Sequence, residues 1–160
     1  MSERVTGLVL CCSFVRNPLP ALSSLSGLID SLPLARIPVT LLSFFLLGGY
    51  SSAALRAALA AGLTKVAPEV MRARMRAVLS VDVSEKLSRL SIPLLYLRAK
   101  HDRVVPHAAG ELIMTLLPSA RMETLEAPHF LLQTAPREAA RLVAEFLQSV
   151  RDSGHDARQN

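Results

Sequence analysis

Apolar runs separated by helical patterns dominate the chain. A nearly continuous apolar run covers residues 5–14, a second covers 92–97, and a shorter and weaker one covers 122–125. Runs of this kind, with β-branched residues and little alternation, are typical of strands that are covered on both faces, as in parallel sheets. We therefore predict three strands at these positions.

Helical periodicity fills the segment between the first two runs. Pro68 fits the first turn of a helix that has one apolar side and one basic side. The apolar side holds Met71, Met75 and Val78, and the basic side holds Arg72, Arg74 and Arg76. We expect the methionines to pack in the core.

Three further helices are predicted downstream. Asp82 and Glu85 have the spacing of a capping box, which places Asp82 at the N-cap of a short helix. Residues 108–117 form the next helix, and residues 134–150 form the last, with Pro136 in its first turn.

Strands that alternate with helices indicate the α/β class, with a doubly wound, mainly parallel sheet. We assign residues 1–17 and 91–151 to this core and residues 152–160 to a disordered tail. Residues 18–90 are too many for a simple crossover, so we predict that they form a separate helical layer.

Charge and composition narrow the class of protein. Of 160 residues, 51% are hydrophobic, which is enough for a buried core, and the net charge is +5. The arginines are scattered, aromatic residues make up only 4%, and no nucleic-acid motif is present, so we expect no nucleic-acid partner. The apolar stretch 37–49 is shorter than the ~20 residues of a membrane span, so we expect none.

The two cysteines, Cys11 and Cys12, are neighbours inside the first predicted strand. Adjacent side chains of a strand point to opposite faces, so we expect no disulfide between them. The lack of a disulfide framework favours a reducing compartment, and we expect a cytoplasmic protein. No spacing typical of a metal site and no glycine-rich phosphate loop is present, so neither a metal nor a cofactor is expected.

Two turns carry candidate chemistry. Asp102 follows the second predicted strand, and His129 follows the third. In parallel sheets, functional groups gather beyond the carboxyl ends of the strands. A carboxylate beside an imidazole fixes its tautomer and stabilises its protonated form, as activation of a hydroxyl requires. The other histidines, His101, His107 and His155, are expected to be exposed or in loops.

The segments HDRVVP and APHF, each after a predicted strand and before a helix, resemble the last third of an α/β-hydrolase. In that family the triad follows the order serine, acid, histidine. The resemblance implies that Asp102 is the acid and His129 the base, that residues 2–14 form the sixth strand, and that residues 18–90 form a cap over the active site. Two details depart from the family pattern: Pro128 precedes the histidine, and Ala99-Lys100-His101 stands where glycine is common.

The nucleophile elbow G-x-S-x-G of the family belongs before the sixth strand, so by this resemblance we expect it to lie outside the chain. The segment Gly49-Tyr50-Ser51-Ser52-Ala53 is similar to an elbow but falls in the cap, and we expect Ser51 to be a helix N-cap. With the fifth strand missing, we also expect the first strand to present an open edge that promotes self-association.

The resemblance implies a partial serine hydrolase for a small-molecule carboxylic ester. Apolar cap residues would line an acyl pocket: Leu41, Leu42, Phe44 and Phe45. Two alternatives remain open. The chain is an inactive or degenerate hydrolase fragment, or it is an interaction module whose arginine-bearing cap binds an acidic partner such as an acyl-carrier protein.

Overall fold

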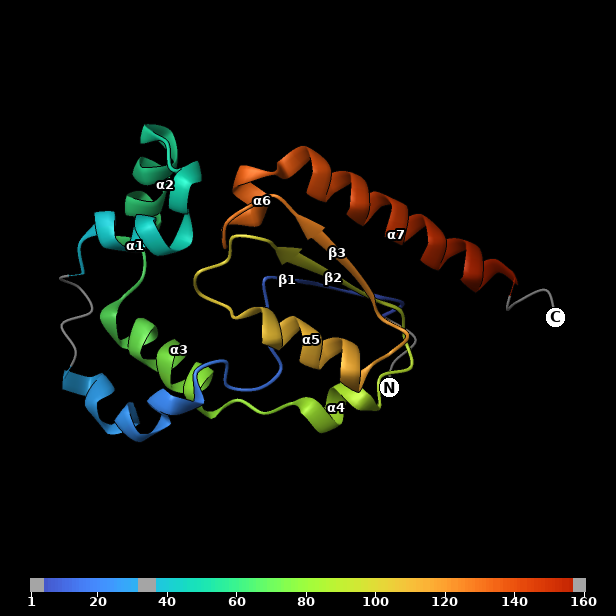
Figure 1. The fold of residues 1–160 in the computed structure, drawn as a ribbon, viewed down its shortest axis with the longest axis horizontal. Helices are drawn as coiled ribbons and strands as arrows, with labels where there is room; N and C mark the ends of the chain where they lie inside the picture. Colours follow the sequence, from blue (N-terminus) through green and yellow to red (C-terminus); the bar gives the residue numbers. More distant parts are fainter. Residues whose placement is uncertain (1–4, 32–36, 157–160) are drawn as a thin grey trace.

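The computed structural model describes residues 5–31 and 37–156 of the chain. Its sheet contains three parallel strands in the order β1 (Leu8–Cys11), β2 (Leu94–Ala99) and β3 (Arg121–Leu125). The strands run side by side through the centre of the molecule (Figure 1). The predicted α/β class and parallel sheet are confirmed.

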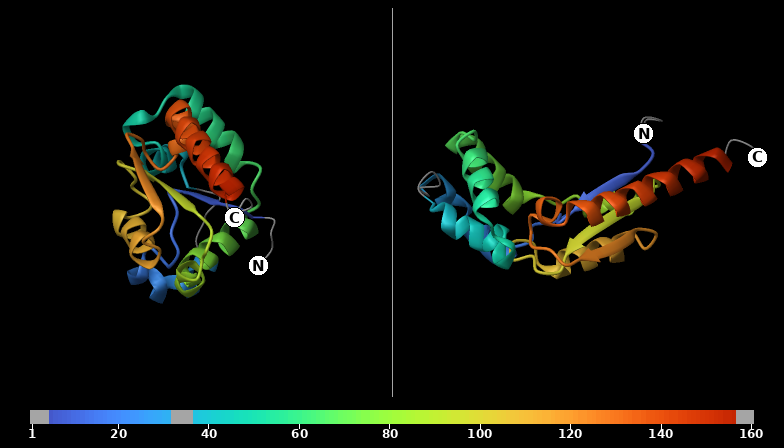
Figure 2. Two further views of the ribbon diagram at one scale, coloured as in Figure 1. Left: turned by 90° about the vertical axis from the view of Figure 1, so that its right-hand side faces the viewer. Right: turned by 90° about the horizontal axis from the view of Figure 1, so that it is seen from above.

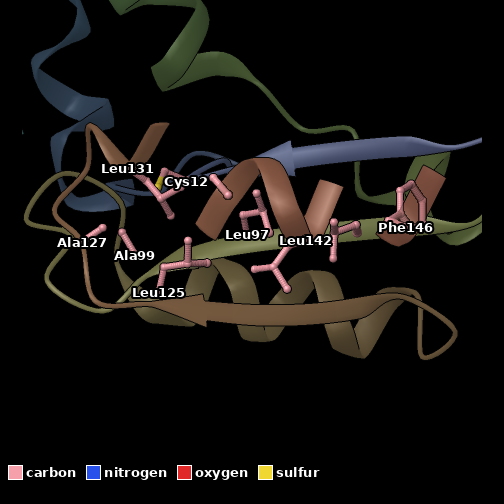
Figure 3. Packing of buried hydrophobic residues seen from close by; sticks show 10 residues of the cluster. Cys12, Leu97, Ala99, Leu125, Ala127, Leu131, Leu142 and Phe146 are labelled. Atoms are coloured by element: carbon pink, nitrogen blue, oxygen red, sulfur yellow. The ribbon is translucent and has the colours of Figure 1, made fainter. Parts of the chain in front are cut away.

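Alternate side chains of the middle strand, β2, lie in two separate hydrophobic clusters, one on each face of the sheet. Leu95 and Leu97 point to the face covered by α7 (Pro136–Asp156), where they join Leu142 and Phe146 in one buried cluster (Figure 3). The period of two that defines a strand places their neighbours on the other face.

That opposite face is covered by α4 (Ser84–Ser88) and α5 (His107–Leu116). Leu94 and Tyr96 pack there with Leu87 of α4 and Ile113 of α5. Figure 1 and Figure 2 show α7 on one side of the sheet and these two helices on the other. Helix α4, which falls within the segment 18–90 that we assigned to a separate helical layer, therefore packs on the sheet, and the domain boundaries themselves stay a prediction.

The rest of the insertion lies at one end of the sheet (Figure 1). Its elements are η1 (Pro20–Ser31), α1 (Val39–Leu46), η3 (Gly48–Tyr50), α2 (Ala53–Leu63) and α3 (Pro68–Ser80). Pro68 occupies the first turn of α3, as predicted. The two methionines that we expected in the core, Met71 and Met75, are only half-buried along α3, as is Val78.

The first strand is shorter than the predicted 5–14. It ends at Cys11 because Cys12 has a left-handed φ of +43°, which turns the chain out of the extended conformation. Both cysteines are free, and both contact the cluster under α7, so the prediction that they face opposite layers is wrong. Residues 2–4 of the predicted sixth-strand segment lie outside the described part of the chain.

Two predictions at helix ends also need correction. Asp82 is not the N-cap of α4: its carboxylate accepts a hydrogen bond from the Ser84 N–H at 2.9 Å, and Val83 occupies the cap position. Helix α7 continues to Asp156, well into the tail that we expected to be disordered, while residues 157–160 lie outside the described part. The helix at 107–116 agrees with its prediction within one residue.

Candidate active site

Asp102 is held by the turn that links β2 to α5. Its Oδ1 atom accepts hydrogen bonds from the N–H groups of Val104 at 2.8 Å and Val105 at 2.9 Å. Val105 is itself buried, which anchors the turn in the core. Hydrogen bonds within its own loop therefore hold the carboxylate in place independently of His129, which is a common use of aspartate in turns.

His129 reaches Asp102 from the turn after β3. The Nδ1 atom of His129 lies 2.9 Å from Oδ2 and 3.2 Å from Oδ1 of Asp102. The Asp102 side chain is only 4% exposed, whereas that of His129 is 21% exposed. The structure thus brings together the two predicted site residues, with the carboxylate buried and the imidazole accessible.

The two loops are paired by their backbones beyond the ends of the strands. The N–H of Lys100 donates to the carbonyl of Leu125, and the N–H of His101 donates to that of Ala127, both at 3.0 Å. These bonds extend the pairing of β2 with β3 up to the turn that holds His129. The short Asp102–His129 contact therefore follows from the register of two parallel strands.

The environment of Asp102 favours its ionised form. Burial raises the pKa of the carboxyl, but the hydrogen bonds from His129 and from the N–H groups of Val105 and Val104 outweigh this effect. The pKa of Asp102 consequently lies below its ordinary value. A buried carboxylate that accepts the Nδ1 proton leaves Nε2 of His129 as the basic atom, which is the arrangement that general-base catalysis uses.

Cys12 is a third member of this site that sequence reasoning missed. A ligand atom of Cys12, one of Asp102 and one of His129 all lie within 4.8 Å of one another. The left-handed backbone at Cys12 brings its thiol to the same cluster as that of Cys11. The Cys12 thiol donates a hydrogen bond to the sulfur of Cys11, and this bond together with burial raises the pKa of Cys12, so the thiol is protonated near neutral pH. No signal in the sequence indicates a positive φ at a cysteine.

Helix α1 contacts both loops of the candidate site. The N–H of Phe130 donates to the carbonyl of Leu46 at the end of α1, at 3.0 Å. The guanidinium of Arg103 donates to the carbonyl of Phe44 at 3.2 Å and lies 4.4 Å above the centre of the Phe44 ring. The residues that follow Asp102 and His129 are thus each bonded to α1.

The apolar residues proposed for an acyl pocket mostly face solvent. Leu41, Phe44 and Phe45 are 48%, 56% and 43% exposed, while Leu42 is half-buried. The rings of Phe44 and Phe45 meet edge to face, with centroids 5.3 Å apart. They form an exposed apolar patch on α1, and their role in an acyl pocket stays a prediction.

Ser51 does not have the setting of a nucleophile elbow. An elbow follows a strand, but the segment before Ser51 is the helix α1 and the short turn η3. The Ser51 hydroxyl lies 3.0 Å from the Ser43 hydroxyl and accepts a hydrogen bond from Arg56. The N-cap of α2 is Ser52, whose side chain accepts from the N–H of Leu55, so the predicted capping role of Ser51 is wrong.

The remaining histidines are separate from the pair. His101 is exposed and contacts Glu126 at 2.9 Å, and His107 is also exposed, as predicted. The side chain of His155 lies outside the described part of the structure. A cavity of about 480 Å³ is lined by residues such as Arg16, Asp82 and Pro106, and it involves neither Asp102 nor His129.

Solved structures share this arrangement of elements. An enol-lactonase from Burkholderia xenovorans LB400 superposes with a TM-score of 0.77 at 16% sequence identity, over 91% of this chain and 57% of the other. A thermophilic esterase from Thermogutta terrifontis gives a TM-score of 0.77 at 18% identity, over 92% of this chain and 57% of the other. The chain has an α/β-hydrolase fold. It covers just over half the length of these proteins, and identities this low establish the fold alone.

A curated relative matches along the whole sequence. Monoacylglycerol lipase ABHD6 from Rattus norvegicus is 24% identical over 159 residues, which are 99% of this chain and 39% of the relative. No family model matches the chain. Within the residues that the structure describes, no helix is long and apolar enough to cross a membrane. The chain therefore spans well under half the length of this relative, and the similarity agrees with the α/β-hydrolase fold.

Proposed function

We propose that the chain supplies the acid and the base of a serine-hydrolase triad that cleaves small carboxylic esters. The observation that carries this proposal is the 2.9 Å contact between Asp102 Oδ2 and His129 Nδ1 beyond the carboxyl ends of β2 and β3. The esterase, enol-lactonase and monoacylglycerol lipase among the similar proteins favour an ester or lactone substrate.

The geometry supports a distinct role for each residue. Asp102 accepts the Nδ1 proton, which holds the imidazole in the tautomer with a basic Nε2. His129 then takes the proton of a serine hydroxyl as that oxygen attacks the ester carbonyl, and returns it to the departing alcohol. Within the described residues, the hydrogen bonds of the His129 ring are those to Asp102, so Nε2 is available for this transfer.

The serine in this proposal comes from a polypeptide segment outside the 160 residues. The best internal candidate, Ser51, follows a helix and is engaged by Ser43 and Arg56. The match to 39% of the curated relative leaves room for a separate nucleophile segment in a complete hydrolase.

A chimera tests the proposal. The part of the Thermogutta terrifontis esterase that precedes the region matched here is joined to this chain, and hydrolysis of a short-chain p-nitrophenyl ester is measured. We expect activity that Asp102→Asn lowers by about 10⁴-fold, as the same change does in serine proteases, and that His129→Gln abolishes. His101→Gln is the matched control, because His101 also contacts a carboxylate but is exposed.

Two results would contradict the proposal. Activity that survives His129→Gln in a folded chimera would remove the base assigned here. Labelling of the 160-residue chain alone by a fluorophosphonate, lost in Ser51→Ala, would place the nucleophile within the chain instead.

A further inference from the structure

Three different ligand atoms meet at the end of the sheet. The Sγ atom of Cys12, a carboxylate oxygen of Asp102 and a ring nitrogen of His129 lie within 4.8 Å of one another. They come from the ends of three neighbouring strands, so the whole sheet fixes their spacing. Figure 3 shows Cys12 in this region, beside Leu131 and close to Ala99 and Ala127.

The separations suit a tetrahedral metal. Zinc binds sulfur at about 2.3 Å and nitrogen or oxygen at about 2.0–2.2 Å, which places tetrahedral ligand atoms roughly 3.3–3.7 Å apart. The Asp102 Oδ2 and His129 Nδ1 atoms, now 2.9 Å apart, would separate by a few tenths of an ångström. The Sγ atom of Cys12 lies within 4.8 Å of both atoms, so a small shift would bring it into contact with a metal bound between them.

The donor set selects the kind of metal. A thiolate, an imidazole and a carboxylate together suit zinc, whereas magnesium and calcium prefer sites made of oxygen atoms. Cys12 is 7% exposed and the Asp102 side chain 4% exposed, so water competes weakly for these positions.

We propose that Cys12, Asp102 and His129 form a binding site for Zn²⁺ in which the metal takes the place of the proton between Asp102 and His129. The Cys12 thiol gives its proton to solvent and binds as a thiolate. The neutral imidazole moves its proton from Nδ1 to Nε2, and Asp102 binds as the carboxylate it already is. The two negative ligands balance the charge of the metal, and one proton is released for each zinc bound.

The bound metal also has a consequence for catalysis, which rests on the proposed function. An imidazole that binds zinc through Nδ1 carries its proton on Nε2 and cannot accept one from a serine. Zinc is therefore an inhibitor of the triad, and removing the Cys12 thiol relieves that inhibition.

Binding is tested on the full chain, without any ester, after reduction by a phosphine. Cobalt(II) is titrated first, because a thiolate-to-cobalt charge-transfer band reports a sulfur ligand, and zinc is then added to displace it. We expect one metal per chain and a band that Cys12→Ser removes. Calorimetry of zinc in buffers of different ionisation enthalpy should give one proton released.

Two further variants identify the other ligands. His129→Gln leaves both thiols in place and should weaken zinc binding by at least about tenfold. His101→Gln should leave the affinity unchanged, because His101 and Glu126 form a similar pair that lacks a thiol. Circular dichroism checks that each variant is folded.

Several outcomes would overturn the site. Unchanged zinc affinity in His129→Gln would show that the adjacent cysteines alone bind the metal. Loss of zinc binding in His101→Gln would place the metal on the exposed surface at His101 and Glu126. A folded parent chain that binds no zinc would contradict the proposal. None of these results affects the esterase proposal, and an inactive chimera leaves the binding result intact.

Discussion

Gly110 of helix α5 packs closely against Tyr96 of β2, so its replacement by alanine tests the packing of this face. A Cβ atom at Gly110 would lie 2.7 Å from Cε1 and 3.3 Å from Cζ of Tyr96. The Tyr96 ring is 2% exposed, and its hydroxyl donates a hydrogen bond to the carbonyl of Ser13 at 3.0 Å. The ring is thus held at both ends and cannot turn away, so α5 must shift.

The size of the effect follows from two opposing contributions. Alanine is better than glycine in a helix interior by about 0.8–1.0 kcal/mol. Overpacking of a tight core costs typically about 1–3 kcal/mol. We therefore expect Gly110→Ala to lower the free energy of unfolding by about 1 kcal/mol. Gly62 is the matched control, because it lies in α2 and a Cβ atom added there would meet no atom within 4 Å.

Urea denaturation followed by circular dichroism measures both variants. Gly62→Ala should raise the midpoint through a gain of about 0.5–1 kcal/mol, while Gly110→Ala should lower it. The chain concentration is kept constant, because self-association would shift both midpoints. A Gly110→Ala protein that is stabilised as much as Gly62→Ala would refute the close packing of α5 on Tyr96.

Two further predictions concern acid stability and association. Because the pKa of Asp102 is lowered in the folded protein, its contribution to stability is complete above the unfolded-state pKa of about 3.9 and is lost as the pH falls through the folded pKa. Asp102→Asn should flatten the acid side of the stability profile, and an unchanged acid side would contradict this. In the described sheet β1 pairs only with β2, so sedimentation of the 160-residue chain should give a mass that rises with concentration, whereas a constant monomer mass would rule out association through this edge.

Sequence patterns were sufficient for the central part of the fold. The run before Asp102 is apolar at nearly every position because β2 is buried on both faces, and such runs are hard to mistake. The pairing of Asp102 with His129 could be predicted because turns that follow neighbouring parallel strands meet at one edge of the sheet. The apolar run and the pairing of the two turns can both be predicted from residue types and from the order of the elements along the chain.

Features set by backbone conformation could not be predicted in the same way. The apolar run 5–14 gives no sign that Cys12 adopts a φ of +43°, so the predicted strand is too long and the predicted face of the Cys12 thiol is wrong. Ser51 and Ser52 are adjacent and chemically identical, and only the observed start of α2 decides which one caps it. These details depend on tertiary contacts rather than on local preference.

Helix α1 is hydrogen-bonded to both loops of the candidate site, so its position is coupled to theirs. Raising α1 would break the bond from Phe130 to Leu46 and the bond from Arg103 to Phe44. At about 0.5–1.5 kcal/mol for each bond, the two bonds together add about 1–3 kcal/mol to the free energy needed to raise α1. Because those bonds start at the residues that follow His129 and Asp102, we expect any ligand that moves α1 to shift the Asp102–His129 pair as well.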